Sequence, residues 1–243
     1  MPSRPLSARD RARRELGQNF LVDRATARRL VSLLELARPT PVVELGAGGG
    51  AVTRELAGHP VTAVEIDPYW ARVLRTRCPW ARVVHDDVLR FRFPRTDHVV
   101  IGNLPYSQTT AILRRLLGET AWSRAALLVQ FDVARKRAEG GSMFNAQWAP
   151  WYEFRLCGRV RAQAFRPVPS VDGGLLVVRR RERPLVPRCE IDPYQAMVGA
   201  VFTGRGRGLP AVLRNLRIPV PRGLRPDVLP RDLAPEDWAR LHR

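Results

Sequence analysis

Short apolar runs alternate with stretches of helical periodicity through the first 130 residues, and this alternation restricts the chain to few folds. The apolar runs lie at residues 41–46, 61–66, 82–85, 97–102 and 125–130. The stretches before and between them predict helices at residues 24–36, 51–57, 68–77 and 108–117. Strands that alternate with helices form βαβ units. We therefore predict an α/β fold with a mostly parallel sheet and helices on both of its faces.

The last third of the chain follows a different pattern. Residues 152–162 and 174–179 predict an antiparallel pair of strands, joined by the proline-rich turn FRPVPSVDG. After Arg179 the sequence RRRERPLVPR reads as a linker, and helices are expected at residues 193–203, 208–215 and 235–242. We therefore expect three parts: a basic flexible tail (1–16), a catalytic domain (17–180) and a small all-α domain (181–243).

The charge of the chain points to a polyanionic partner. There are 41 basic and 23 acidic residues among 243, a formal net charge of +18, and Lys136 is the only lysine. The preference for arginine over lysine is typical of a GC-rich coding sequence, but the excess over acids is not explained by codon usage. The flanks are the most basic, at +3 for residues 1–16 and +7 for 179–243. Such an excess favours nucleic acid over a membrane as partner.

Several classes of protein are disfavoured by the same composition. No apolar stretch reaches the 18 or so residues of a spanning helix, and the basic N-terminus lacks the apolar core of a signal peptide. Cys78, Cys157 and Cys189 are far apart, as free thiols of a cytoplasmic protein would be. The four histidines show no ligand spacing, so we expect no metal site.

A glycine-rich turn lies where a parallel sheet would place a ligand. The segment ELGAGGG (44–50) follows the first predicted strand and precedes a helix. Glycines there allow tight turns and close approach of the backbone to a ligand. Glu65 ends the second predicted strand, 19 residues beyond Gly46, where an acid in a doubly wound fold binds ribose hydroxyls. Together they indicate a nucleotide-like cofactor, whereas Asp67 is better explained as a helix cap before Pro68.

The tetrapeptide Asn103-Leu-Pro-Tyr106 follows the fourth predicted strand and suits chemistry on an amino group. An aromatic amine is a poor nucleophile because its lone pair is delocalised. Two acceptors, the side-chain oxygen of Asn103 and the carbonyl of Leu104, would hold both amino hydrogens and favour a tetrahedral nitrogen. Pro105 would fix the carbonyl direction, and Tyr106 would stack on the base. The alternative is a plain turn in which Asn103 caps the following helix.

Six ordered motifs resemble the S-adenosylmethionine-dependent rRNA adenine-N6 methyltransferases over residues 15–215. The motifs are GQNFL (17–21), ELGAGGG (44–50), EID (65–67), DVL (87–89), NLPY (103–106) and FRPVPSVDGG (165–174). The resemblance implies a Rossmann-like methyltransferase sheet with a small C-terminal all-α domain. It also implies cofactor contacts at Asn19, Leu21, Gly46, Glu65, Asp87 and Asn103. Asp86 precedes Asp87, so that assignment is open by one residue, although DVL favours Asp87.

For the target base, the resemblance implies a catalytic set of Asn103, Leu104, Pro105, Tyr106 and Phe165, the last closing over the flipped adenine opposite Tyr106. Without the motif, Phe165 would be read as a core residue. RNA contacts are expected in the tail, after the fifth strand and in the small domain, at Arg9, Arg11, Arg13, Arg14, Arg135, Lys136, Arg137, Arg205, Arg207 and Arg214.

The flanking motifs favour the erythromycin-resistance branch of this family. Three segments resemble that branch: FTGRGRGLP (202–210), the sequence SVDGG (170–174) and the arginine-rich N-terminus. This implies N6-methylation of an adenine in large-subunit (23S) rRNA, before full ribosome assembly, by a monomeric cytoplasmic enzyme that confers macrolide-type resistance. The alternatives are a small-subunit rRNA dimethyladenosine transferase, a non-catalytic RNA-binding factor of the same fold, and a methyltransferase acting on DNA.

Overall fold

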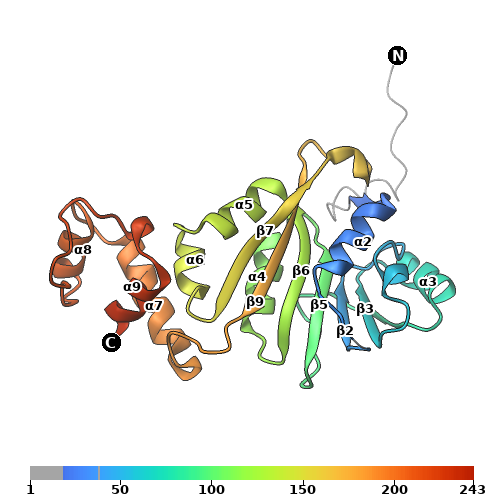
Figure 1. Cartoon of the computed structure of the whole chain (residues 1–243), viewed down its shortest axis with the longest axis horizontal. Helices are drawn as coiled ribbons and strands as arrows, with labels where there is room; N and C mark the ends of the chain where they lie inside the picture. The colour runs from blue at the N-terminus through green and yellow to red at the C-terminus, as the bar shows by residue number, and fades with distance from the viewer. Residues whose placement is uncertain (1–18, 38) are drawn as a thin grey trace, which may run out of the picture. The chain divides into compact units, whose positions relative to one another are not determined.

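The computed structural model describes residues 19–37 and 39–243. Seven strands form its main sheet, in the order β4-β3-β2-β5-β6-β9-β7 (Figure 1). Their bounds are β2 Val42–Leu45, β3 Val61–Glu65, β4 Arg82–His85, β5 His98–Asn103, β6 Trp122–Gln130, β7 Tyr152–Val160 and β9 Gly173–Arg180. The pairs β2–β3, β3–β4, β2–β5 and β5–β6 are parallel, which confirms the expected parallel sheet.

The order of the strands reverses beside β2. The chain runs outward through β3 and β4, and then returns to place β5 on the other side of β2. Leu45, the last residue of β2, pairs with Val64 on one side and with Gly102 on the other. The residues that follow these strands therefore emerge at one edge of the sheet, at the point where doubly wound folds bind ligands.

Helices flank the sheet of unit 1. They are α2 Arg24–Ser32, α3 Pro68–Arg77 and α4 Thr109–Gly118. Asp23 caps α2 by accepting the backbone N–H of Thr26 at 2.8 Å, and Asp67 caps α3 in the same way, with Pro68 in the first turn. Figure 1 shows α2 on the near side of the sheet and α4 behind it.

Two local expectations were wrong or incomplete. Instead of the α-helix expected at residues 51–57, the chain forms a short 3₁₀ helix, η1 Thr53–Leu56. The three glycines before it favour turns over a continuous α-helix. The helices α5 Phe131–Glu139 and α6 Met143–Trp148 were not expected at all. Ala134 is the one fully buried residue of α5, so the sequence of this helix has no apolar stripe from which it could be predicted.

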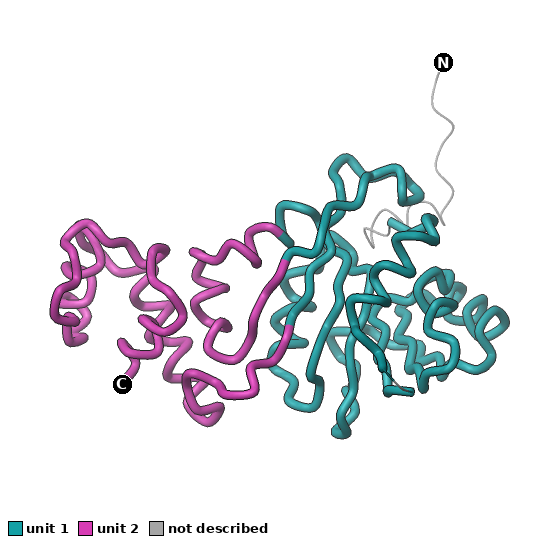
Figure 2. Tube along the Cα trace, in the orientation of Figure 1, with its two compact units in different colours: residues 1–134, 156–178 teal, residues 135–155, 179–243 magenta. Residues whose placement is uncertain are grey.

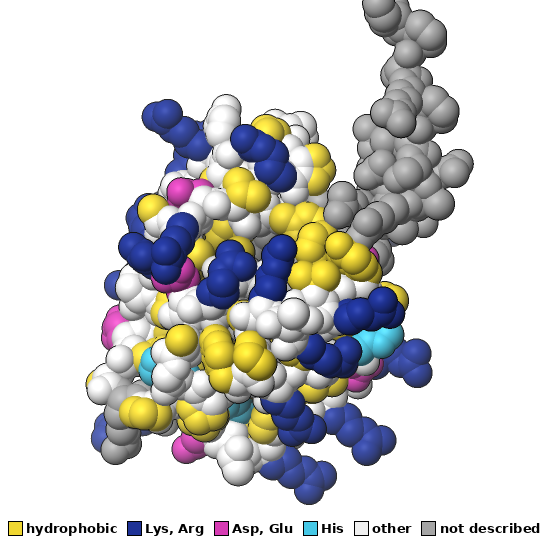
Figure 3. Space-filling model, turned by 90° about the vertical axis from the view of Figure 1, so that its right-hand side faces the viewer, with side chains coloured by type: hydrophobic (Ala, Val, Ile, Leu, Met, Phe, Trp, Pro, Cys, Tyr) yellow, Lys and Arg dark blue, Asp and Glu magenta, His cyan; other side chains and the backbone are white. Residues whose placement is uncertain are grey.

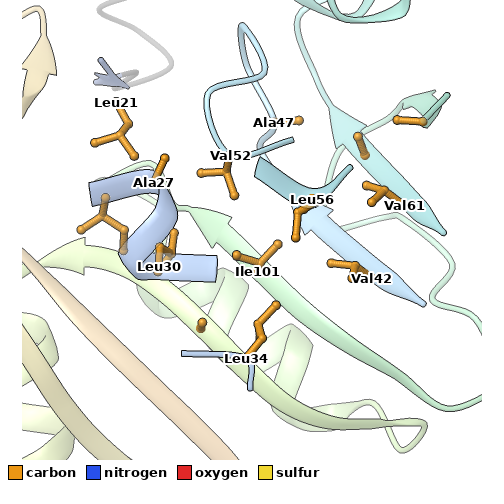
Figure 4. Packing of buried hydrophobic residues seen from close by; sticks show 14 of the residues in the cluster. Leu21, Ala27, Leu30, Leu34, Val42, Ala47, Val52, Leu56, Val61 and Ile101 are labelled. Carbon is orange, nitrogen blue, oxygen red and sulfur yellow. The ribbon is translucent and has the colours of Figure 1, made fainter. Parts of the chain in front are cut away.

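The core of the first half lies between α2, η1 and the strands. Leu30 and Leu34 from the α2 region point toward Val42 and Ile101 of the sheet, with Leu56 of η1 beside them (Figure 4). Leu30, Leu56 and Ile101 are completely buried. Burial of each such side chain stabilises the fold by about 1.5–3 kcal/mol, so this layer holds the strand ends in place.

The described chain forms two compact units (Figure 2). Unit 1 comprises the described residues up to Ala134 together with residues 156–178. Unit 2 comprises residues 135–155 and 179–243. A second, two-stranded sheet in unit 1 pairs β1 Phe20–Leu21 with β8 Phe165–Arg166, β8 being preceded by the 3₁₀ helix η2 Ala162–Ala164. The boundary expected between residues 180 and 181 stays a prediction.

Unit 2 contains the three helices expected near the C-terminus. They are α7 Ile191–Thr203, α8 Leu209–Asn215 and α9 Pro235–His242, with 3₁₀ helices η3 Arg188–Glu190 and η4 Pro230–Asp232 between or before them. Trp151 packs edge-on to Tyr194 at 5.3 Å between ring centroids, and Phe202 stacks on Trp238 at 5.6 Å. This unit therefore has an aromatic core of its own.

Candidate active site

A cavity of about 360 Å³ opens at the carboxyl edge of the unit 1 strands. Its lining comes from five segments that are distant in sequence, within residues 19–22, 44–54, 65–77, 87–88 and 103–112. All of the predicted cofactor residues line it, namely Asn19, Leu21, Gly46, Glu65, Asp87 and Asn103. The volume suits a small-molecule ligand of nucleoside size.

The glycine-rich turn approaches the NLPY segment closely. Gly46 has a φ of +69°, and a Cβ there would lie 3.6 Å from the carbonyl oxygen of Asn103. Gly48 has a φ of +53°, and its Cβ would lie 3.1 Å from the ring of Phe20. Both backbones are left-handed, a conformation that side chains disfavour. The turn therefore forms a cradle of bare backbone, which fits the cofactor that the motifs imply.

Glu65 is held rigidly at the cavity wall. One oxygen accepts the N–H of Gly48 at 2.7 Å, and the other accepts the N–H of Asp67 at 2.9 Å. The residue is buried, and desolvation raises the pKa of its carboxyl above the usual range, although the two backbone donors oppose the shift. Each carboxylate oxygen keeps a second lone pair, so Glu65 is able to accept ligand hydroxyl groups.

Asp87 lines the cavity, and the neighbouring Asp86 is not among the lining residues of the described chain. Asp86 instead accepts the N–H of Asp87 at 2.8 Å, while Asp87 accepts the N–H of Leu89 at 2.9 Å. This turn aims Asp87 inward. The geometry favours Asp87 of the two candidates, and its contact with the cofactor adenine stays a prediction.

Glu44 is a second buried acid at the cavity that the sequence reasoning did not single out. It accepts the hydroxyl hydrogen of Thr53 at 2.6 Å. Burial raises the pKa of Glu44 to about 8, with a further contribution from the nearby charge of Glu65. An acid within an otherwise apolar strand was the available signal, because such a residue is buried only at a cost.

Asn103 joins the N-terminal motif to the NLPY segment. Its side-chain nitrogen donates to the carbonyl oxygen of Asn19 at 2.7 Å. With the nitrogen engaged, the side-chain oxygen is the atom left for a substrate. The alternative role as a helix cap is wrong, since α4 begins at Thr109 and the residue preceding it is Gln108.

The rest of the tetrapeptide is fixed by backbone bonds. The N–H of Leu104 donates to Leu128 in β6 at 2.9 Å, and the carbonyl of Pro105 accepts from Gln108 at 3.0 Å. Leu104 and Pro105 both line the cavity. The carbonyl of Leu104 therefore belongs to a segment anchored on both sides.

Tyr106 and Phe165 lie side by side, but neither is among the lining residues of the cavity. Their ring centroids are 6.4 Å apart at an angle of 69°. Phe165 is completely buried against the backbone of Gly173, where a Cβ would come within 3.1 Å of its ring. Stacking of an adenine between the two rings thus requires Phe165 to swing out of the core, and its predicted role stays a prediction.

The hydroxyl of Tyr106 is buried and has no hydrogen-bond partner among the described residues. Burial raises the pKa of Tyr106 to about 12, with a smaller effect from Asp172, so the phenol is neutral at physiological pH. Asp172 itself accepts the N–H of Ala162 at 2.8 Å and pairs with Arg159 at 2.6 Å. It anchors the turn that carries Phe165, a role that the sequence reasoning did not assign.

The residues expected to contact RNA are not gathered at the cavity. Arg135, Lys136 and Arg137 lie on α5, and Arg205, Arg207 and Arg214 lie in or before α8; all six belong to unit 2. The guanidinium of Arg137 stacks on the ring of Phe144 at 3.9 Å, so this side chain is engaged within the unit. Arg9, Arg11, Arg13 and Arg14 lie outside the described residues.

Two arginines that were not singled out do line the cavity. Arg77 donates to the carbonyl of Gly49 at 3.2 Å, and Arg54 approaches the same oxygen at 3.5 Å. Within the described part of the chain, no helix is long and apolar enough to cross a membrane, and no cluster of three potential metal ligands is found.

Comparison with known proteins gives consistent matches. The family model for ribosomal RNA adenine dimethylase matches residues 9–222. The mycinamicin-resistance protein MyrB of Micromonospora griseorubida is 49% identical over 95% of this chain and 78% of its own length. An rRNA adenine N-6-methyltransferase of Corynebacterium diphtheriae is 46% identical over 86% of this chain and 85% of its own. The crystal structure of the 23S rRNA methyltransferase ErmE superposes with a TM-score of 0.81 at 33% identity, covering 92% of this chain and 98% of that one.

Proposed function

The chain belongs to the ribosomal RNA adenine dimethylase family, and we propose that within this family it methylates N6 of an adenine in 23S rRNA. It is an S-adenosylmethionine-dependent rRNA adenine-N6 methyltransferase by family. The assignment to 23S rRNA is supported by its likeness to ErmE and MyrB. Because MyrB is a mycinamicin-resistance protein, we extend the proposal to resistance against macrolide-type antibiotics in the host.

One observation carries the proposed chemistry: Asn103 donates from its side-chain nitrogen to Asn19 at the wall of the cavity, which leaves its side-chain oxygen as an acceptor for the substrate. S-adenosylmethionine supplies an electrophilic methyl group when it is bound. Glu65 would accept its ribose hydroxyls and Asp87 its adenine amino group, and the glycine-rich turn leaves room for the methionine part.

The target adenine would be held by the NLPY segment. The Asn103 side-chain oxygen and the Leu104 carbonyl would accept its two amino hydrogens. Tyr106 would stack on one face of the base, and Phe165 on the other after turning out of the core. With both hydrogens held, the amino nitrogen would present its lone pair for methylation. The proton that the nitrogen loses would pass to water, because the alkylated nitrogen is acidic. The residues thus act by positioning and exclusion of water rather than as a strong base.

The proposal is tested by a methylation assay on protein-free 23S rRNA beside immature small ribosomal subunits. We expect methyl transfer to the 23S rRNA, with one modified adenine found by mass spectrometry of the digested RNA. The same spectrum separates one added methyl group from two. Transfer only to the small subunit would support the dimethyladenosine-transferase alternative, transfer to a DNA competitor a DNA enzyme, and no transfer at all a non-catalytic RNA-binding factor.

The finer properties belong to the same proposal. We take the protein to act as a cytoplasmic monomer on rRNA that is not yet fully assembled, because the target base must leave the RNA fold to enter the cavity. We assign RNA binding to the tail (1–16) and to residues 181–243, whose net charges are +3 and +5. Loss of substrate binding on removal of residues 1–16, with cofactor binding kept, is the expected result.

A further inference from the structure

One stretch of unit 1 exposes arginines without exposing acids. Between residues 66 and 92 six arginines are exposed: Arg72, Arg75, Arg77, Arg82, Arg90 and Arg92. The three aspartates of the stretch are half-buried, and each accepts a backbone N–H. None of the six arginines pairs with a carboxylate anywhere in the described chain. By contrast, Arg24 and Arg28 on α2 both pair with Glu55.

The same stretch holds two exposed aromatic side chains. Tyr69 is 42% exposed and Trp80 is 43% exposed. Among the large apolar side chains that the described residues expose, these two are the aromatic ones. Exposed aromatic rings among unpaired arginines are a combination that solvation alone does not favour, since each ring costs hydrophobic free energy in water.

Local geometry places these side chains on one surface. In α3, Ala71 and Leu74 face the core, so Tyr69, Arg72 and Arg75 lie on the opposite, exposed side. Trp80 lies in the turn between α3 and β4, and Arg82 begins β4, the last strand at this end of the sheet. Arg75 reaches from the helix to the carbonyl of Val83 in β4 at 3.4 Å. Figure 3 shows this side of the molecule, with basic side chains gathered around apolar ones.

The surface begins at the rim of the cavity. Ile66, which precedes the cap of α3, and Arg77, the last residue of α3, both line the cavity. The helix has 10 residues and is therefore about 15 Å long, which is the length of roughly four stacked nucleotides. A strand of nucleic acid that leaves the cavity along α3 would thus meet arginines and aromatic rings in turn.

We propose that the α3 surface, defined as Tyr69, Arg72, Arg75, Trp80 and Arg82, binds unpaired nucleotides of the rRNA substrate beyond the target adenine. This rests on the proposed function. Arginine forks bind phosphates, and aromatic rings stack on bases. Only unpaired nucleotides offer free base faces, because an A-form duplex covers them. The site gives the enzyme affinity for RNA around the target without touching the reacting atoms.

Three variants of the full chain, each with two or three substitutions, test the proposal. The charge variant carries Arg72→Gln, Arg75→Gln and Arg82→Gln, and the aromatic variant carries Tyr69→Ser and Trp80→Ser. The control variant carries Arg24→Gln, Arg28→Gln and Arg124→Gln, which removes the same charge from arginines of unit 1 that pair with Glu55 or Glu35. Thermal melting checks that each variant is folded. The affinity for a 23S rRNA fragment is measured at several salt concentrations, together with kcat and KM for RNA.

We expect the charge variant to bind RNA about tenfold more weakly and to lower the slope of log K against log salt by about 2, since each phosphate contact on a single strand contributes about 0.7. The aromatic variant should bind about tenfold more weakly with an unchanged slope. Both should raise KM and leave kcat at saturating RNA unchanged, because the lost contacts are equal in the ground and transition states.

The results separate this inference from the proposed function. Wild-type protein that does not methylate rRNA contradicts the proposed function. If the wild type methylates rRNA but both variants keep the affinity, slope and KM of the control variant, the α3 surface does not bind RNA. Binding of the wild type to vesicles containing phosphatidylserine, lost in the charge variant and not displaced by RNA, would assign the surface to a membrane instead and overturn the inference.

Discussion

Replacement of Asn103 by alanine is the sharpest test of the proposed chemistry. The substitution removes two contacts: the acceptor oxygen proposed for the target amino group, and the donor to Asn19 at 2.7 Å. Loss of one preorganised polar contact to a transition state typically lowers kcat by about 10²–10³, or roughly 3–4 kcal/mol. Loss of the hydrogen bond to Asn19 costs less, on the order of 1 kcal/mol, because Asn19 is half-buried.

The two losses act on different measurements. Asn19 lines the cofactor cavity, so the smaller cost should appear as a cofactor Kd about fivefold weaker. The larger cost should appear in kcat under saturating cofactor and RNA. Single-turnover methylation of 23S rRNA and calorimetric titration of the cofactor measure the two separately. Asn103→Asp keeps an acceptor and loses the donor, so its kcat should fall less than that of Asn103→Ala.

A matched variant controls for the loss of an amide–backbone bond in general. Asn145 is buried, and its side-chain nitrogen donates to the carbonyl of Arg137 at 2.6 Å in unit 2. Asn145→Ala should lower the melting temperature and leave kcat unchanged. A kcat of Asn103→Ala within threefold of wild type would refute the proposed role of the side-chain oxygen.

Three further results are expected. Tyr106→Phe should keep wild-type kcat, because the lost hydroxyl has no partner in the described structure, whereas Tyr106→Ala should lose at least tenfold with the stacking surface; equal loss in both would contradict stacking. Gly46→Ala should weaken cofactor binding at least tenfold through strain at its φ of +69°, as measured by calorimetry, and unaltered binding would argue against the cradle. The last concerns Glu44, whose pKa burial raises from 4.5 to about 8, so the folded state keeps a proton that the unfolded chain releases. Its contribution to stability is complete below pH 4.5 and is lost as pH rises to about 8, and urea titrations should show Glu44→Gln without that decline.

The local signals in the sequence predicted most of the first half of the fold. The strands end within one or two residues of the expected positions, apart from β6, which begins three residues earlier, at Trp122. Asp67 begins its helix as expected, and Asp23 caps α2 in the same way, because capping is decided by neighbouring residues. Helix α5 was not predicted because it has no apolar stripe, and contacts with residues distant in sequence hold it in place.

The candidate site was predicted in its members more than in its arrangement. The ordered motifs predicted that Asn19, Glu65 and Asp87 belong to one site, and all three line the same cavity. It said nothing of the hydrogen bond from Asn103 to Asn19, which joins positions 84 residues apart. Nor did it reveal that Phe165 is buried, or that Glu44 and Arg77 line the cavity. Such facts depend on which segments meet in space, and spacing along the chain does not record them.

The sequence by itself determined the parallel sheet, the glycine-rich turn and the family, because periodicity, glycine placement and ordered motifs are local properties of the chain. The excess of positive charge was also evident, and it indicated a polyanion that we expected to contact the basic flanks. Only the tertiary structure decided which arginines stay exposed without a carboxylate partner. It buries some arginines against rings and pairs others with acids, and it leaves those around α3 exposed beside Tyr69 and Trp80. Charge belongs to the composition, but a binding surface exists only after folding has chosen which charges remain unpaired.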